Sequence, residues 1–436
     1  MTPDRGRPWV AVGLAFLAVA CTVGMMRGRA SSDLLFYGSA LAQSAVAAAA
    51  GGFGARANGR AAVLLLVGTA IGLRAFLIFE PPSLSTDVYR YVWDGKVVNA
   101  GVNPYTHIPD DPSLAYLRDP AIFDNITRRD YAVTIYPPVA EGFFALVTRI
   151  TASLTAMKLA LTLAEAVAVL ALLRLLKDLG RPRGLVFGYL LHPAPLWEIA
   201  GNGHVDALAM AFLYGAFAWG GGAARPYVSA TLLTFGALAK PAAALGLPGV
   251  WRPLQIVLPL FVVALGLACY LPFLGAGVGV LGFLPIFVRE HGMDTGDGFY
   301  WIALIEQFRP RPPAASPVYY ALSGALLLGL ALASRWRAGV DLRQSLLATA
   351  RLLVASLLIL TPGLPWYFLL ALPMTALLGW WSPFAMCSAG FVLYDFNDDF
   401  AGDAPAFFAR WSVAVGVGAA AALADALRTP EKGVRS

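Results

Sequence analysis

A short polar segment that follows an apolar run carries the first residues whose types and spacing could do chemistry. Asp87 opens this segment, Arg90 follows, and Asp94 closes it. If the segment is helical, with Ser85 or Thr86 as its N-cap, the three charged side chains share one face. A carboxylate at the edge of an apolar run is costly, which favours a chemical role for Asp87. For Asp94 the alternative is a solvated ion pair with Arg90 on an amphipathic helix at the membrane surface.

A second group of polar side chains occupies the turn GNGHVD, residues 201–206. The chain has four histidines, and His204 stands near Asn202 and Asp206 where an apolar run begins. One histidine with one or two carboxylates lacks the three or four convergent ligands of a metal site, so no metal is predicted. Capping of the next helix by Asn202 or Asp206 is one explanation. The boundary position favours substrate positioning by His204 and Asp206.

Two other positions place a charge or aromatic rings beside proline in apolar surroundings. Lys240 precedes Pro241, and its side chain must either reach an interface or meet an anion such as a lipid phosphate. The sequence leaves both possibilities open. Trp366 and Tyr367 end the turn TPGLPWY, where an interfacial aromatic belt is the alternative to a binding role.

Aromatic and proline-rich stretches recur in the long polar loop from Glu80 to Glu141. Tyr105 ends GVNPY and Tyr136 lies in TIYPP. The prolines predict turns that fix the loop, while stacking of the tyrosine rings against a sugar is the functional alternative. A second polar loop, about 276–315, carries Arg289, Glu290, His291, Asp294 and Asp297.

The elements that must position these residues are membrane helices, because the chain is too apolar to be soluble. Of its 436 residues 58% are hydrophobic and 13% are charged, with a mean hydropathy of +0.66. Soluble domains have about 45–50% apolar and about 25% charged residues. Because apolar runs return throughout, we expect one polytopic membrane domain over residues 1–436.

The charge distribution predicts the sidedness of this domain. The net charge of +6 is not gathered in one patch, so no nucleic-acid partner is expected. Basic residues recur in short loops between apolar runs, as the positive-inside rule describes. They are Arg5, Arg7, Arg56, Arg60, Lys177, Arg181, Arg183, Arg225, Arg335, Arg337, Arg343, Arg428, Lys432 and Arg435. The loop at 80–141 holds nine of the 26 acidic residues and five basic ones, and is predicted to face outward.

The apolar runs predict an all-α fold of about 12–14 transmembrane segments. They lie near 9–26, 34–54, 61–79, 158–176, 184–199, 205–222, 227–250, 255–275, 316–334, 344–361, 366–381, 383–395 and 405–427. A single span at 227–250 would place the loop at 335–343 outside, against the charge rule. We therefore expect a broken pair that turns near Lys240. Nucleotide-binding glycine loops are absent from the sequence, so no cofactor is predicted.

The ordered set of motifs resembles the GT-C class of membrane glycosyltransferases, and within it the bacterial polyprenyl-phosphate-mannose-dependent mannosyltransferases. The resemblance covers about residues 61–381. It rests on DVYRY with WDG, NPY, YPP, GHVD, KP and PWY. In one respect the chain departs from the class, whose members commonly carry the catalytic Asp directly after the first span. Here the acidic loop follows the third, which would mean two added N-terminal helices.

The resemblance implies a sugar transfer with inversion at the outer face of a bacterial inner membrane, with Asp87 as general base. The donor would be a sugar, such as mannose, on polyprenyl phosphate, and the acceptor a lipid or glycan. Cations such as Arg90, Lys240 and Arg289 would stabilise the leaving phosphate. No metal would be needed, and the isoprenoid tail would lie between spans among membrane lipids.

Two other classes of function fit some of the same features. A secondary transporter or lipid flippase also has many spans, broken helices and intramembrane charges. The long acidic loop and the lack of two similar halves speak against it. A membrane acyltransferase would place a histidine deep in the membrane, where His192, beside Pro193, is the candidate.

Overall fold

The computed structural model describes residues 8–56, 59–252, 255–312, 314–337, 341–394 and 404–428. Within these residues the chain is helical and contains no strand. Eight helices are long and apolar enough to cross a membrane, which confirms the prediction of an all-α polytopic membrane protein. Four members of the predicted charge pattern, Arg5, Arg7, Lys432 and Arg435, lie outside the described residues.

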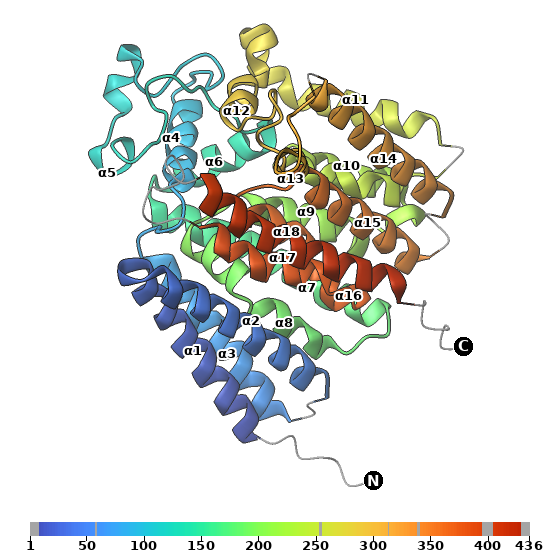
Figure 1. Ribbon diagram of the computed structural model, residues 1–436. Coiled ribbons are helices and arrows are strands. Elements are labelled where there is room, and N and C mark those ends of the chain that lie inside the picture. Colours follow the sequence, from blue (N-terminus) through green and yellow to red (C-terminus); the bar gives the residue numbers. More distant parts are fainter. Residues whose placement is uncertain are drawn as a thin grey trace.

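The three N-terminal helices form one side of the molecule (Figure 1). They are α1 (Pro8–Ser31), α2 (Asp33–Arg56) and α3 (Arg60–Phe79), as the first three apolar runs predict. A Cβ on Gly54 would lie 2.6 Å from the carbonyl oxygen of Gly184, so glycine is needed where these two segments touch. Small residues allow such close approach within a membrane.

The first large loop folds into short helices, and its own acidic side chains cap two of them. These are α4 (Asp87–Asn99), η1 (Pro112–Leu117), α5 (Pro120–Phe123) and α6 (Pro138–Ile150). Asp111 accepts from the backbone N–H of Ser113, and Asp119 accepts from that of Ala121. Part of the acidity of this loop therefore serves helix N-termini.

Helix α4 lies inside the protein and not on its surface. Its Gly95 packs against α6, where a Cβ would lie 2.4 Å from the carbonyl oxygen of Phe144, and the rings of Tyr91 and Phe144 stack at 4.4 Å. Asp94 is 1% exposed and Arg90 11%. The solvated ion pair considered for Asp94 and Arg90 is therefore wrong, because α6 and the loop cover that face.

The middle of the chain departs most from the predicted spans. After α7 (Leu154–Asp178), the apolar run at 184–199 forms three short pieces instead of one span: η2 (Arg183–Val186), α8 (Phe187–Leu190) and the π-helix η3 (Pro195–Gly201). Prolines at 193 and 195 lack the backbone N–H that a continuous helix needs. The run resumes as α9 (Asp206–Ala218).

The predicted break near Lys240 is confirmed. Helix α10 (Pro226–Ala237) ends before Lys240, and the 3-10 helix η5 (Pro241–Gly249) begins after it. The two fold back on each other, because a Cβ on Gly236 would lie 3.1 Å from that of Ala243. Lys240 therefore lies at the tip of a helical hairpin.

The C-terminal part combines long helices with short ones. Its elements are α11 (Val257–Tyr270), η6 (Leu271–Leu281), α12 (Leu284–Glu290), α13 (Tyr300–Glu306), α14 (Ala315–Arg337), α15 (Leu342–Leu360), η7 (Pro365–Ala371), α16 (Pro373–Leu378), α17 (Ser382–Gly390), η8 (Phe391–Leu393) and α18 (Ala404–Leu427). With three shorter apolar helices beside the eight long ones, the described residues hold fewer full spans than predicted.

The two large loops meet on one side of the molecule, at the top of Figure 1. Glu290 accepts hydrogen bonds from Arg128 at 2.8 Å and from the Tyr131 hydroxyl at 2.7 Å. The N–H of Phe283 donates to the carbonyl of Thr134, beside Gly282, where a Cβ would lie 1.9 Å from that oxygen. Loops in contact must share a side of the membrane, as the charge pattern predicts.

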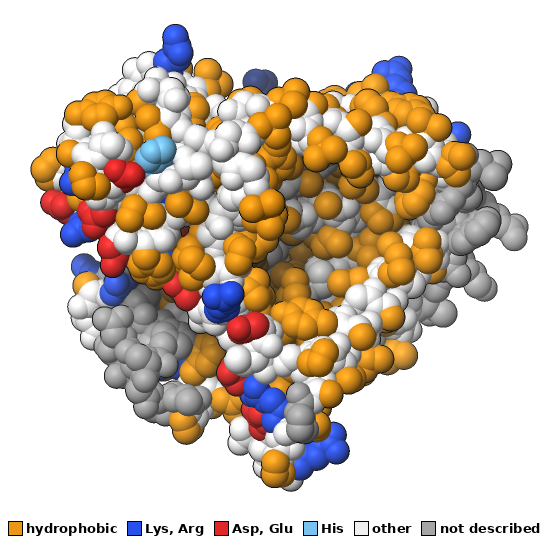
Figure 2. Space-filling model, turned by 90° about the horizontal axis from the view of Figure 1, so that it is seen from above, with side chains coloured by type: hydrophobic (Ala, Val, Ile, Leu, Met, Phe, Trp, Pro, Cys, Tyr) orange, Lys and Arg blue, Asp and Glu red, His pale blue; other side chains and the backbone are white. Residues whose placement is uncertain are grey.

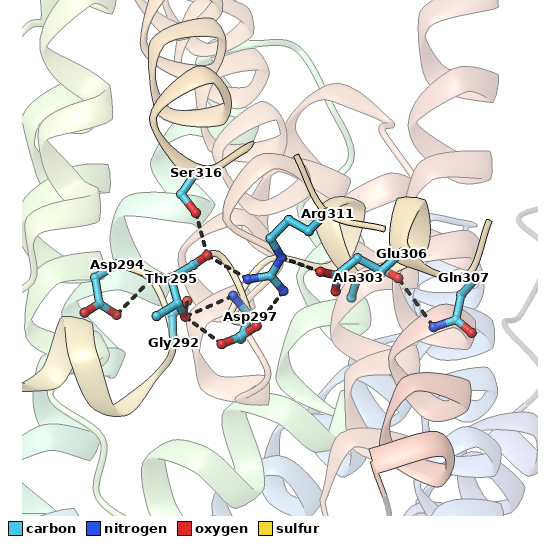
Figure 3. Close-up of polar contacts among 9 residues, drawn as sticks. All are labelled: Gly292, Asp294, Thr295, Asp297, Ala303, Glu306, Gln307, Arg311 and Ser316. Atoms are coloured by element: carbon cyan, nitrogen blue, oxygen red, sulfur yellow. Dashed lines mark hydrogen bonds and ion pairs between the residues drawn. The ribbon is translucent and has the colours of Figure 1, made fainter. Parts of the chain in front are cut away.

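An internal network holds the second loop together. Figure 3 shows Arg311 in contact with two chain segments: with Glu306, and with the turn at 295–297 through the carbonyl of Thr295 at 2.7 Å and the carboxylate of Asp297. The Ser316 hydroxyl donates to the same Thr295 carbonyl at 2.6 Å. This arrangement ties the start of α14 to the loop.

A charged pair is buried between two membrane-spanning helices. The guanidinium of Arg74, on α3, donates to both carboxylate oxygens of Glu165, on α7, at 2.9 and 2.6 Å. A third nitrogen donates to the carbonyl of Leu190 at 2.9 Å. The pair therefore connects the N-terminal bundle to the broken segment that leads to the turn at 201–206.

Candidate active site

The turn before α4 is fastened to the turn at 201–206. The Asn202 side-chain oxygen accepts from the backbone N–H groups of Ser83 and Leu84 at 3.0 and 2.9 Å. Asn202 therefore does not cap α9, which was one explanation for its position. The two turns that carry Asp87 and His204 are joined by this amide.

Asp87 is the first residue of α4. Its side chain is 35% exposed, while Val88 and Tyr91 behind it are buried. His204 lies behind the carboxylate, with its ring Nδ1 3.8 Å from the Asp87 Oδ2. Gly203 has a φ of +72°, and a Cβ there would lie 3.0 Å from Val88, so glycine is needed for this approach.

A buried ion pair lies beside this carboxylate. The ammonium of Lys240 is 2.9 Å from the Asp206 carboxylate, at exposures of 16% and 1%. It also lies 4.6 Å above the ring of Tyr367, within the range of a cation–π contact. Of the two possibilities left open for Lys240, the structure therefore shows an anionic partner within the protein.

A turn with a strained residue precedes the two aromatic residues of the site, Trp366 and Tyr367. Thr361 has a φ of +41°, an uncommon conformation for a β-branched residue. Its hydroxyl accepts from the N–H of Tyr300, and its carbonyl accepts from the indole of Trp411. This turn leads to η7, where the Trp366 ring stacks on His204 at 4.3 Å.

The structure thus brings together six of the residues singled out from the sequence, with Tyr136 at their edge, and it places the others elsewhere. The six are Asp87, His204, Asp206, Lys240, Trp366 and Tyr367. Arg90 donates to Asp94 at 2.7 Å and to the carbonyl of Ala132. Tyr105 is buried, with its hydroxyl on the Tyr136 carbonyl at 2.6 Å, and Arg289 is exposed near the end of α12.

Burial sets the electrostatics of the Asp87 carboxylate. The surrounding protein raises its pKa, and the charge of Asp206 adds to this effect. The positive charges of Lys240 and Arg128 act in the opposite direction, as does the Tyr136 hydroxyl. Tyr136 therefore belongs to the edge of this cluster.

Asp94, on α4, lies near a second buried carboxyl group, Glu141, which sequence reasoning did not single out. Glu141 is fully buried, accepts from the Thr134 hydroxyl at 2.6 Å, and lies near Asp94. Burial raises the pKa of both, and the Asp94 charge drives that of Glu141 well above its usual range. The positive charge of Arg90 acts on both carboxyl groups and lowers the pKa of each. Both are buried inside the large loop.

Sequence reasoning also missed Glu198 and Arg128. Glu198 stands in the apolar stretch PLWEIAG, and a carboxylate in such a run is costly enough to have marked it. Arg128 has a φ of +60°, which its sequence context does not reveal. Across the described ranges, no three His, Cys, Asp or Glu side chains converge in a way that could hold a metal ion.

Comparison with known proteins identifies the family. A model of the N-terminal domain of alpha-(1->6)-mannopyranosyltransferases matches residues 31–254, just over half of the 436-residue chain. The match includes Asp87, His204, Asp206 and Lys240, whereas Trp366 and Tyr367 lie beyond it. No curated protein and no solved structure gives a match. The chain therefore belongs to the alpha-(1->6)-mannopyranosyltransferase family, and it is a multi-pass membrane glycosyltransferase that acts with mannose.

Proposed function

We propose that this enzyme transfers mannose from a polyprenyl-phosphate carrier to a lipid or glycan acceptor, with inversion and with Asp87 as general base. The observation that carries the proposal is the position of Asp87. Its carboxylate is partly exposed, and the cation Lys240 is close enough to lower its pKa. A proton acceptor and a cation side by side are what attack on a glycosyl phosphate requires.

The proposed reaction is a single displacement. The Asp87 carboxylate accepts the proton of the acceptor hydroxyl as that oxygen bonds to the anomeric carbon. The bond from this carbon to the phosphate oxygen breaks, and its electron pair leaves with the phosphate. Lys240 keeps 16% of its side chain exposed, so it can approach the phosphate while paired with Asp206. Attack opposite the leaving group inverts the anomeric centre.

The surface of the molecule supports a lipid-linked donor. Figure 2 shows the face that carries the large loops, which is hollowed, with hydrophobic side chains inside the hollow. Large apolar residues of α11, η6 and α14 are exposed, among them Leu260, Leu267, Leu271, Val278, Leu322 and Leu328. An isoprenoid chain can lie against such surfaces within the bilayer.

The charge pattern supports an outward-facing site in a bacterial inner membrane. Several basic loops meet at the end away from the large loops, where Arg428 donates to the carbonyl of Gly379 and a Cβ on Gly379 would lie 3.5 Å from Arg181. By the positive-inside rule that end faces the cytoplasm. Asp87 would then face outward.

We expect the purified enzyme in liposomes to transfer mannose from polyprenyl-phosphate mannose to a synthetic alkyl α-mannoside. The reason is that the sequence offers no nucleotide-binding loop, while the hollow is apolar. Radiolabelled product is measured with polyprenyl-phosphate mannose and with GDP-mannose as alternative donors. Transfer from GDP-mannose alone would contradict the proposed donor. Uptake of substrate without covalent product would favour the transporter alternative.

The rate should also depend on pH through Asp87. A base works in its deprotonated form, and burial raises the pKa of this carboxyl above the usual value of about 3.9. As the pH is lowered past this raised pKa, Asp87 takes up a proton and activity should be lost, at a pH above about 3.9. The measurement is kcat/KM against pH in liposomes, and a Lys240→Met variant should move this acid limb further upward. An acid limb at or below pH 3.9 would contradict the assignment.

A further inference from the structure

Glu198 is a buried carboxyl group behind the cluster at Asp87. It lies on the π-helix η3 and is completely buried. Its Oε1 accepts a hydrogen bond from the Tyr394 hydroxyl at 2.7 Å. Its Oε2 lies 3.4 Å from Nε2 of His204, whose other nitrogen faces Asp87. The three side chains thus form a row from the interior to the exposed carboxylate.

The hydrogen bonds that would join the three side chains of this row are not formed in the structure. Over the part of the chain that the structure describes, neither His204 ring nitrogen nor the Glu198 Oε2 has a hydrogen-bond partner. Trp366 stacks on the His204 ring and fixes its plane. The backbone N–H of His204 donates to the backbone carbonyl of Glu198 at 2.9 Å. The two gaps, 3.4 and 3.8 Å, each exceed the ordinary hydrogen-bond range of about 2.7–3.2 Å by less than about 1 Å, and such contacts commonly tighten when substrate binds.

The surroundings decide where the protons lie. Tyr394 and Cys387 pack near the Glu198 carboxyl, and the charge of Asp206 also acts on it. None of these is a cation, so a completely buried carboxyl here stays protonated. Burial and the charge of Lys240 lower the pKa of His204 well below its usual range, so its ring is neutral. A neutral ring carries one proton, on either nitrogen.

We propose that Glu198 is a positioning residue: its protonated Oε2 donates to Nε2 of His204, which holds the ring proton on Nδ1, facing the Asp87 carboxylate. This inference rests on the proposed role of Asp87 as base. The Nδ1–H then keeps Oδ2 of Asp87 in place and leaves its second oxygen for the acceptor hydroxyl. Neither Glu198 nor His204 touches the reacting atoms in this arrangement.

The position of the ring proton can be measured apart from activity. Nitrogen NMR of ¹⁵N-histidine-labelled enzyme distinguishes protonated from unprotonated ring nitrogens, and the chain has four histidines. The signal of His204 is the one lost in a His204→Asn variant. We expect wild-type His204 to be protonated on Nδ1. Glu198→Gln, whose amide can still donate to Nε2, should keep that tautomer. Glu198→Met should give a mixture or the opposite one.

Kinetics provide the second readout. We expect Glu198→Gln to keep kcat within about twofold, and Glu198→Met to lower it about tenfold with KM little changed. The acid limb of the pH profile should move upward in Glu198→Met only. Protonation of wild-type His204 on Nε2, or equal behaviour of the two variants, would overturn the proposal. Normal turnover of Asp87→Asn would instead contradict the role of Asp87 as general base. The NMR result would then still show whether Glu198 sets the position of the His204 ring proton.

Discussion

Replacing Asp87 with asparagine is expected to lower kcat about a thousandfold, or by about 4 kcal/mol of transition-state stabilisation. The amide has nearly the same shape as the carboxylate and can keep its place beside His204, but it cannot accept the proton of an acceptor hydroxyl. KM for the donor should change little, because Lys240 and the apolar surfaces remain. The measurement is initial-rate kinetics of mannose transfer in liposomes.

A matched substitution separates loss of the base from loss of loop acidity. Asp130 lies in the same large loop and is exposed, so Asp130→Asn removes the same charge from a side chain outside the cluster of Asp87, His204 and Lys240. That variant should turn over like the wild type. Near-normal turnover of Asp87→Asn, with thermal unfolding unchanged, would remove Asp87 from the reaction.

Replacing Glu165 with leucine is expected to destabilise the protein by about 3–5 kcal/mol. The substitution leaves the Arg74 guanidinium, 8% exposed between α3 and α7, without the carboxylate that accepts two of its hydrogen bonds. An uncompensated charge in the interior of a membrane bundle is costly. The measurement is thermal or denaturant unfolding of the purified protein in detergent, with wild type and variant compared under the same conditions.

The double variant Arg74→Met/Glu165→Leu provides the decisive comparison. Removing both charges eliminates the uncompensated guanidinium, and buried pairs replaced by apolar residues are often neutral in stability. We therefore expect the double variant to recover most of the loss seen in Glu165→Leu. If the double variant were as unstable as the sum of the single ones, the two side chains would not be coupled.

The long helices could be predicted from sequence because a run of about 20 apolar residues has few alternatives in a membrane. The break at Lys240 could also be predicted, since the positive-inside rule required a turn there. Six site residues were found for a related reason. Charged side chains at the ends of apolar runs are costly, aromatic ones mark the membrane interface, and the folded chain brings those ends together.

Other features depend on tertiary contacts that no local pattern encodes. Helix α4 has the spacing of an amphipathic surface helix, and only the packing of α6 against Gly95 makes it an interior one. The apolar run at 184–199 looks like a span, yet its prolines divide it into short pieces. Arg128 is brought near Asp87 by its contact with Glu290, 162 residues away in the sequence.

The π-helical turn at Pro195–Gly201 makes this part of the chain sensitive to its length rather than only to its composition. A π-turn holds one more residue than an α-turn, and such turns are frequent at functional sites. Deleting a single residue there would let the backbone return to ordinary α-helical bonding. A change of length there would therefore move the Glu198 carboxyl away from His204, whatever other side chains the turn carries.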